Sequence, residues 1–124
     1  MMKVMMVAVG GGIGATTRYL VSAWAAEKFG TNFPYGTLIV NVIGCFFIGV
    51  FMTLATERLI VSPYWRLLVT VGFVGGLTTF SSYSYETFKL LEDADITLAL
   101  YNLLGNVLIG FFATWLGISA ARLI

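Results

Sequence analysis

The sequence predicts an all-α integral membrane protein with four transmembrane helices, the third of which is broken near residues 75–79. The chain has 124 residues, of which 59% are hydrophobic and 10% charged, and its mean hydropathy is +0.92. Four predominantly apolar stretches, at 4–26, 36–56, 67–88 and 96–121, are each long enough to cross a bilayer. Because the gaps between them are short, we expect one four-helix domain spanning 1–124.

The first stretch, 4–26, contains one charged residue, Arg18. An arginine near a helix end can extend its guanidinium to the membrane interface, and it can equally line the mouth of a pore, so the sequence leaves both open. A cleavable signal peptide is the alternative for this stretch, because Lys3 gives it a basic start and Ala23-Trp24-Ala25 resembles a cleavage site. The length of the apolar run and the arginine inside it favour a retained helix.

The second and fourth stretches each carry polar residues on one helical face. Thr37 and Asn41 share a face of the second, and residues at four-residue spacing form a stripe on the fourth: Asn102, Asn106, Gly110 and Thr114. Small and polar residues commonly hold membrane helices together, which is the interpretation we favour for the pairs Gly10/Gly14 and Gly72/Gly76. Unsatisfied amides are costly in lipid, so Asn41 and Asn106 are instead candidates to line a polar path.

The third stretch contains the most informative segment, Gly75-Gly76-Leu77-Thr78-Thr79-Phe80-Ser81-Ser82-Tyr83-Ser84-Tyr85-Glu86. A glycine pair followed by hydroxylated residues disfavours an unbroken helix, and irregular backbone at membrane depth is tolerated only where protein or a water-filled cavity satisfies it. Hydroxyls alternating with aromatic rings favour weak, repeated contacts with a permeating ion. Glu86 is either a solvated partner of Lys89 or a buried acceptor for the Ser and Tyr hydroxyls, and the sequence does not separate the two.

Several function classes have no support in the sequence. There is no histidine and only one cysteine, Cys45, so disulfides within the chain and His/Cys metal sites are excluded. No phosphate loop, activated nucleophile or carboxylate pair on one helix face is present, which argues against an enzyme. The net charge of +1 gives no basic patch for nucleic acid, and the short loops suggest no soluble protein partner.

The basic residues divide almost evenly between the two expected membrane faces. Lys3, Arg58, Arg66 and Arg122 fall on one side. Lys28 and Lys89 fall on the other, joined by Arg18 if its side chain extends to that interface. This is a weak bias under the positive-inside rule, so the chain could insert in both directions. Four helices are too few to surround a pore comfortably. We therefore expect an antiparallel, dual-topology homodimer with a two-fold axis in the membrane plane.

Three motifs carry a family resemblance. The segment 75–86, the run Gly36-Thr37-Leu38-x-Val40-Asn41 and the run Gly14-Ala15-x-x-Arg18-Tyr19 resemble those of the Fluc (CrcB-type) fluoride channels. The likeness extends over the whole chain in length, segment number and motif order. It implies a multi-pass protein of the inner (plasma) membrane that passively exports cytoplasmic fluoride. It also implies an antiparallel dimer with two pores and a structural Na⁺ at its centre.

The resemblance further implies roles for individual residues. Asn41 corresponds to the pore asparagine, and Phe80 and Tyr83 to an aromatic pair that presents ring edges to fluoride, although the family usually has Phe at the second position. Gly75 and Thr78 match residues whose carbonyls hold Na⁺, and Arg18 matches a vestibule arginine. The remaining expected pathway residues are Thr37, Thr79, Ser81, Ser84, Glu86 and Asn106.

Two other classes are alternatives to a fluoride channel. Small multidrug transporters are also four-helical and often antiparallel, but they use a carboxylate embedded in the first helix, and residues 4–26 contain no Asp or Glu. In a membrane assembly factor, the polar residues would serve only to hold helices together. A path for fluoride must replace the water around a strongly hydrated anion with hydroxyls, amides and ring edges. The third stretch supplies the hydroxyls and rings, and Asn41 of the second supplies an amide.

Overall fold

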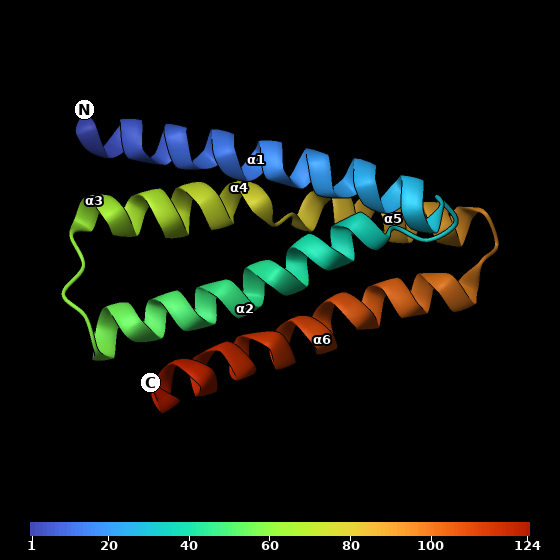
Figure 1. The fold of residues 1–124 in the computed structure, drawn as a ribbon. Coiled ribbons are helices and arrows are strands. Elements are labelled where there is room, and N and C mark those ends of the chain that lie inside the picture. Colours follow the sequence, from blue (N-terminus) through green and yellow to red (C-terminus); the bar gives the residue numbers. More distant parts are fainter.

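The computed structural model describes all residues, 1–124, as helices joined by short connections (Figure 1). Four of its helical spans are long and apolar enough to cross a membrane: Met2–Phe29, Tyr35–Glu57, Pro63–Glu92 and Ile96–Leu123. The third consists of several elements in sequence. The elements are α1 (Met2–Phe29), α2 (Tyr35–Glu57), α3 (Pro63–Arg66), η1 (Leu67–Val74), α4 (Gly75–Leu77), α5 (Phe80–Glu92) and α6 (Ile96–Leu123).

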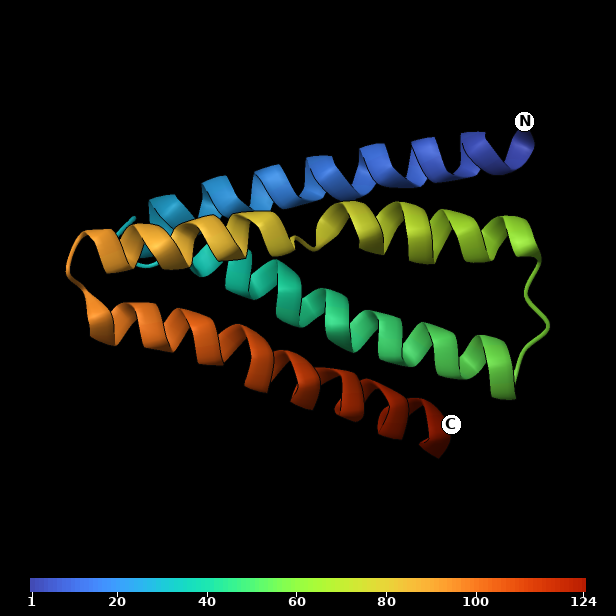
Figure 2. The ribbon, with the colours of Figure 1, turned by 180° about the vertical axis from the view of Figure 1, so that it is seen from behind.

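The spans pack as two pairs with a crossover between them. Helix α1 lies along η1 and α4, and α2 lies along α6, whereas α5 crosses to contact α6. Both termini and the α2–α3 connection lie at one end of the bundle, and the α1–α2 and α5–α6 connections lie at the other (Figures 1 and 2). The third span is thus the element that joins the two pairs.

The third span begins four residues earlier than residue 67, where we expected it. Ser62 explains the earlier start, because its side chain accepts a hydrogen bond from the Tyr64 amide and Pro63 occupies the first turn. The next segment, η1, is a π-helix of eight residues, which the sequence did not predict. π-helical turns are rare and occur most often at functional sites.

Glycines let α1 approach the third span backbone to backbone. A Cβ atom on Gly10 would collide with the Leu68 carbonyl oxygen, and one on Gly14 would collide with that of Phe73. A Cβ on Gly76 would lie 2.6 Å from the Gly11 carbonyl oxygen. The interpretation of Gly10, Gly14 and Gly76 as helix-packing residues is therefore confirmed. We refer to this contact between α1 and residues 68–77 as the glycine contact.

The break itself is narrower than the expected range of 75–79. Gly75–Leu77 is still helical, and only Thr78 and Thr79 leave the helix, with φ/ψ of −85°/157° and −151°/124°. Figure 2 shows the interruption between α4 and α5. The break therefore lies inside the expected range, at its last two residues, and the Gly75-Gly76 pair is still helical. Close packing against α1 compensates for the low helix propensity of Gly76.

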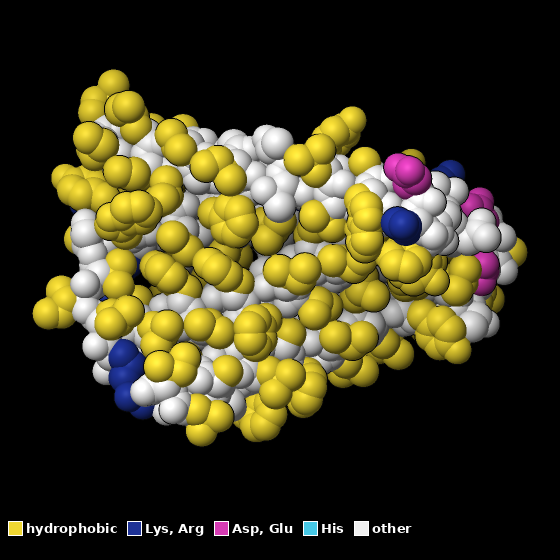
Figure 3. Space-filling view, viewed as in Figure 1, with side chains coloured by type: hydrophobic (Ala, Val, Ile, Leu, Met, Phe, Trp, Pro, Cys, Tyr) yellow, Lys and Arg dark blue, Asp and Glu magenta, His cyan; other side chains and the backbone are white.

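Charged side chains gather at the two ends of the bundle, and apolar ones cover its length (Figure 3). The end with both termini carries Lys3, Arg58, Arg66 and Arg122 with the single acid Glu57. Most acids lie at or near the opposite end: Glu27, Glu86, Glu92, Asp93 and Asp95. The apolar length between charged ends is the surface expected of a protein immersed in a bilayer.

Candidate functional site

The break in the third span places a short extended segment beside α2. Thr79 caps the start of α5, because its Oγ1 accepts a hydrogen bond of 3.1 Å from the Ser82 amide. The same oxygen lies 3.2 Å from the Ser81 hydroxyl. The Thr78 hydroxyl donates to the Val74 carbonyl at 3.0 Å, beside the Thr78 amide that donates to the same oxygen. Hydroxyl side chains thus satisfy polar groups on both sides of the interruption.

Asn41 on α2 holds the extended segment by its backbone. Its Oδ1 accepts a 2.9 Å hydrogen bond from the Thr79 amide, and its Nδ2 donates to the Thr79 carbonyl at 3.1 Å. The same Nδ2 donates to Asn106 Oδ1 at 2.8 Å. One amide therefore pairs with both backbone groups of an interrupted residue, in the manner of a strand partner. The expected pathway residues Asn41, Thr79 and Asn106 are brought together at one place.

Helix α6 packs against α2 and α5 beside the break. Asn106 Nδ2 donates to the carbonyl and to the side-chain Oδ1 of Asn102, at 2.9 and 3.1 Å. Asn102 is fully buried, and its Nδ2 donates to Thr87 Oγ1 at 2.9 Å. Tyr83 is also buried, and its hydroxyl donates to the Leu103 carbonyl at 2.8 Å. The Tyr83 ring is therefore fixed by a bond that a phenylalanine could not make.

Three other expected pathway residues of α5 lie on its outer face. The Phe80 side chain is 76% exposed and meets the Tyr83 ring edge to face, with centroids 5.6 Å apart and planes at 62°. Ser81 and Ser84 line a shallow surface hollow beside Phe80. The structure therefore places Tyr83 on the inner face of α5 and Phe80, Ser81 and Ser84 on its outer face, whereas Glu86 is half-buried.

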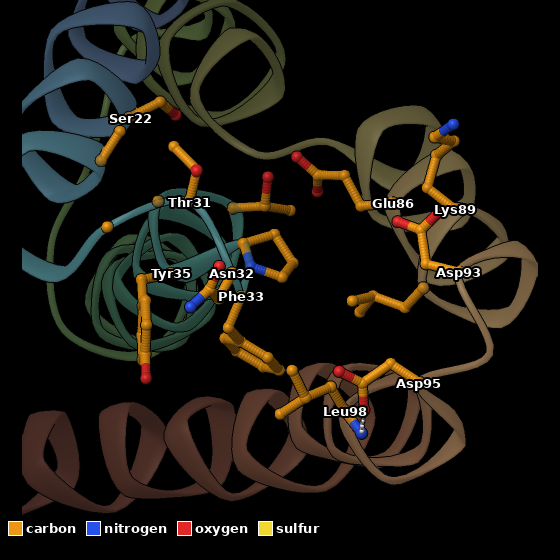
Figure 4. Close-up of a pocket in the computed structure, with 16 residues that line it drawn as sticks. Ser22, Thr31, Asn32, Phe33, Tyr35, Glu86, Lys89, Asp93, Asp95 and Leu98 are labelled. Atoms are coloured by element: carbon orange, nitrogen blue, oxygen red, sulfur yellow. Dashed lines mark hydrogen bonds between the residues drawn. The ribbon is translucent and has the colours of Figure 1, made fainter.

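A cavity of about 610 Å³ opens at the acidic end of the bundle. It is lined by Thr37 of α2, by the α1–α2 connection and by Glu86, Lys89 and Asp93 near the end of α5. In Figure 4 the Glu86 carboxylate points into this cavity, whereas the Lys89 ammonium points away from it.

Glu86 has neither of the environments that we considered for it. Lys89 lies 3.8 Å from Glu92 rather than pairing with Glu86. Glu86 is half-buried, and its Oε1 is buried without a hydrogen-bond partner. A buried carboxylate oxygen without a donor is unusual, and its place at a cavity wall is compatible with contact to a solute or to water.

Arg18 does not extend to the membrane interface, because its Nε donates to the Gly76 carbonyl at 3.1 Å. Its role at a pore mouth stays a prediction. Gly76 belongs to the last helical turn before the break, where carbonyls have no partner further along the helix. A cation at the carboxyl end of a helix also interacts favourably with the helix dipole. Arg18 therefore stabilises the end of the first half of the third span.

The sequence did not single out two residues of this site. Asn102 was assigned only to the polar stripe of the fourth stretch, and Thr87 was not noted at all. The signal for Asn102 was its four-residue spacing from Asn106, which a helix turns into contact between neighbouring amides. No signal for Thr87 existed in the sequence, because its role depends on the packing of α5 against α6.

Comparison with known proteins agrees with the geometry. Residues 5–118 match the model of a family described as "CrcB-like protein, Camphor Resistance (CrcB)". The chain belongs to the CrcB-like family. A relative from Geotalea daltonii, named "Fluoride-specific ion channel FluC", is 48% identical over 124 residues and covers all of both chains. A protein of the same name from Solibacter usitatus is 48% identical over 121 residues, 98% of this chain and 99% of its own.

Membership of the CrcB-like family distinguishes between the function classes that the sequence left open. The resemblance is confirmed over the full chain, and the curated relatives are ion channels rather than enzymes. A third relative, from Sulfurihydrogenibium, bears the same name and is 48% identical over 124 residues. The protein is a multi-pass membrane protein with four spans. A small multidrug transporter and an assembly factor no longer have any support.

Proposed function

We propose that the chain is a passive, fluoride-selective ion channel that exports cytoplasmic fluoride across the inner membrane and so relieves fluoride toxicity. The observation that carries this proposal is the amide of Asn41, held at the break between the Thr79 backbone and Asn106. The names of the relatives support the choice of ion. The path would run through Asn41, Phe80 and Tyr83, with further contacts to Thr37, Thr79, Ser81, Ser84, Glu86 and Asn106.

The chemistry of this path suits a small, hard anion. Fluoride sheds water only where amide hydrogens, hydroxyls or ring edges replace it, and all three kinds of group surround the break. The cation nearest to the break, Arg18, donates to the Gly76 carbonyl. Weak neutral donors allow the ion to leave as readily as it enters, which conduction requires. In acidic surroundings fluoride enters as HF, ionises inside, and would leave through the channel under an inside-negative potential.

Fluoride efflux from liposomes containing the pure protein tests the proposal. We expect efflux down the electrochemical gradient without ATP or an imposed proton gradient, measured with a fluoride electrode. Empty liposomes and the Asn41→Asp variant serve as controls. Transport that occurs only with a proton gradient would refute a passive channel, and no fluoride transport would refute the choice of ion.

The outer face of α5 supports the proposal of a dimer. Phe80, Ser81 and Ser84 are expected pathway residues, yet in a single chain they lie on its surface. A second copy seated there would enclose them. Two identical faces brought together by a two-fold axis would form two equivalent pores. The short loops and the weak bias of basic residues support an antiparallel arrangement over a parallel one.

The backbone at the break supports a structural Na⁺ between the two copies. The carbonyl of Gly76 is already occupied by Arg18, and that of Val74 by the amide and hydroxyl of Thr78. Gly75 lies in the same terminal turn and is exposed, and Thr78 is extended, so its carbonyl leaves the helical pattern. Carbonyls are hard donors that suit Na⁺. The carbonyls of Gly75 and Thr78 from both copies would hold the ion and stabilise the pairing of the subunits.

Orientation can be tested by adding charge. Two or three Lys residues added at the C-terminus should force one orientation and abolish fluoride efflux, because no oppositely oriented partner is made. Co-expression with a copy biased the other way should restore efflux. A biased copy that alone retains full activity would show that the functional unit is parallel.

A further inference from the structure

A continuous chain of side-chain hydrogen bonds connects α5, α6 and α2. It begins at Thr87, passes through Asn102 and Asn106, and ends at Asn41, which binds the Thr79 backbone. Its most deeply placed member, Asn102, is 0% exposed. Every step is between 2.8 and 3.1 Å. We call these four side chains the amide chain.

The direction of each amide in the chain is fixed from Thr87. The Thr87 hydroxyl hydrogen is donated to the Tyr83 carbonyl at 2.8 Å, so toward Asn102 the Thr87 oxygen can only accept. Asn102 must therefore turn its Nδ2 to Thr87 and its Oδ1 to Asn106. Asn106 meets that oxygen, and the Asn102 carbonyl beside it, with its own Nδ2.

This direction continues to the break and occupies both hydrogens of the Asn41 amide. Asn106 presents Oδ1 to Asn41, which donates one hydrogen to it and the other to the Thr79 carbonyl. The Thr79 amide, which can only donate, fixes the Asn41 Oδ1 from the opposite end. Both ends of the chain thus impose the same direction. An anion can obtain a hydrogen from Asn41 only by replacing an acceptor that is already present.

We propose that Asn102 is a positioning residue for fluoride conduction, an inference that rests on the proposed function. By holding the Nδ2 of Asn106, Asn102 keeps the Asn106 oxygen facing Asn41, where it competes with fluoride for one amide hydrogen. When fluoride takes that hydrogen, Asn106 cannot rotate to donate to the ion as well. The ion is held weakly and is released when the Asn106 oxygen returns to Asn41.

Replacement of Asn102 should therefore tighten fluoride binding while it slows transport. In Asn102→Leu, Asn106 Nδ2 loses the side-chain Oδ1 of residue 102 and keeps only its backbone carbonyl as an acceptor, so it turns toward the ion more readily. We expect the fluoride concentration that gives half-maximal flux to fall by about fivefold, the effect of roughly one added hydrogen bond. The maximal flux should fall as well. A defect limited to folding would lower the maximal flux and leave the half-saturating concentration unchanged.

A second variant tests the direction of the chain with less disturbance of packing. Thr87→Val keeps the side-chain shape but removes the nearer acceptor of Asn102 Nδ2 and leaves only the Tyr83 carbonyl at 3.5 Å. It should shift half-saturation in the same direction by a smaller amount. In an Asn106→Ala background, neither Asn102→Leu nor Thr87→Val should cause a further shift. Thr114→Val is the matched control on α6, because the Thr114 hydroxyl donates only to its own helix at Gly110 and should leave both parameters unchanged.

The measurement is fluoride flux from liposomes over a range of fluoride concentrations, with each variant's dimer content checked by gel filtration. A parent protein that carries no fluoride would refute the proposed function and this inference with it. A conducting parent with unchanged half-saturation in both Asn102→Leu and Thr87→Val would overturn the inference alone. Shifts that persist in the Asn106→Ala background would also overturn it, because Asn102 would not be acting through Asn106.

Discussion

The two halves of the third span pack against neighbouring helices in different ways. Residues 63–77 are almost entirely apolar, include a π-helix, and pack backbone to backbone against α1 through the glycine contact. Residues 80–92 instead join α6 through hydroxyl and amide hydrogen bonds, including those of Tyr83 and Thr87. The first half depends on shape and the second on polar partners. The break allows one span to use both, because each half can face a different neighbour.

The largest effect on fluoride flux is expected at Asn41, which binds the break between the two halves of the third span. In Asn41→Asp, a carboxylate oxygen replaces the Nδ2 that donates to the Thr79 carbonyl and to Asn106 Oδ1. The variant also places a negative charge where fluoride must pass. We expect fluoride flux in liposomes to fall by about a hundredfold or more, equivalent to roughly 3 kcal/mol at the barrier. Flux equal to that of the parent, with the dimer intact, would show that Asn41 is only a packing group.

The glycine contact should respond to added volume rather than to lost polarity. Gly14→Ala introduces a Cβ that collides with the Phe73 carbonyl and lies 2.9 Å from the Leu77 amide. We expect a loss of about 1–3 kcal/mol in the free energy of unfolding, because backbone atoms must move to make room. Unfolding in detergent, followed by circular dichroism, measures it.

Gly12→Ala is the control for this change, because a Cβ on Gly12 meets nothing within 4 Å. It lies on the same helix and should leave the stability unchanged or raise it by up to about 1 kcal/mol through better helix propensity. Equal losses in Gly12→Ala and Gly14→Ala would show that the glycines matter for the helix itself and not for its contact with the third span.

A smaller effect is expected on the outer face of α5. Phe80→Ile keeps the residue apolar but removes the ring that meets Tyr83 edge to face, an interaction of about 0.5–1.5 kcal/mol. We expect fluoride flux to fall severalfold while monomer stability changes little, because Phe80 is 76% exposed. Flux in liposomes is again the measurement.

Phe88→Ile is the matched control for the outer face. Phe88 lies on the same helix and lines the same surface hollow, and it is 64% exposed. Phe80 pairs with the Tyr83 ring, whereas the Phe88 ring pairs with no other aromatic ring. A loss of flux in Phe88→Ile as large as in Phe80→Ile would indicate that bulk on this face, rather than the Phe80 ring edge, determines conduction.

Much of this fold could be predicted from residue type and spacing, because lipid restricts what a backbone can do. The four spans, the break in the third and the polar face of the fourth follow from hydropathy, from hydroxyl-rich sequence and from four-residue spacing. The contact of Asn41 with Asn106 depends on the packing of α2 against α6. The position of the break at Thr78 and Thr79, and not at Gly75-Gly76, does not follow. It depends on the close packing of Gly76 against Gly11 of α1. These residues are far apart in the sequence, so no local sequence pattern indicates their contact.

The role of Arg18 and the division of α5 into two faces were equally inaccessible. The sequence placed Arg18 near a helix end, but its partner, the Gly76 carbonyl, is 58 residues away and becomes available only because the helix stops after it. The burial of Tyr83 and exposure of Phe80, three residues apart, depend on where α6 lies. Long-range packing decided both.

The separation of charge along the bundle has a consequence for its behaviour in an energised membrane. A single copy, with a mostly basic end and a mostly acidic end, is an electric dipole directed along its membrane spans. Each elementary charge moved across 100 mV changes the free energy by about 2.3 kcal/mol, so voltage acts on the orientation of one copy. Two copies lying head to tail cancel their dipoles. Such a pair would feel no torque from the membrane voltage, and neither of its two paths would be favoured over the other.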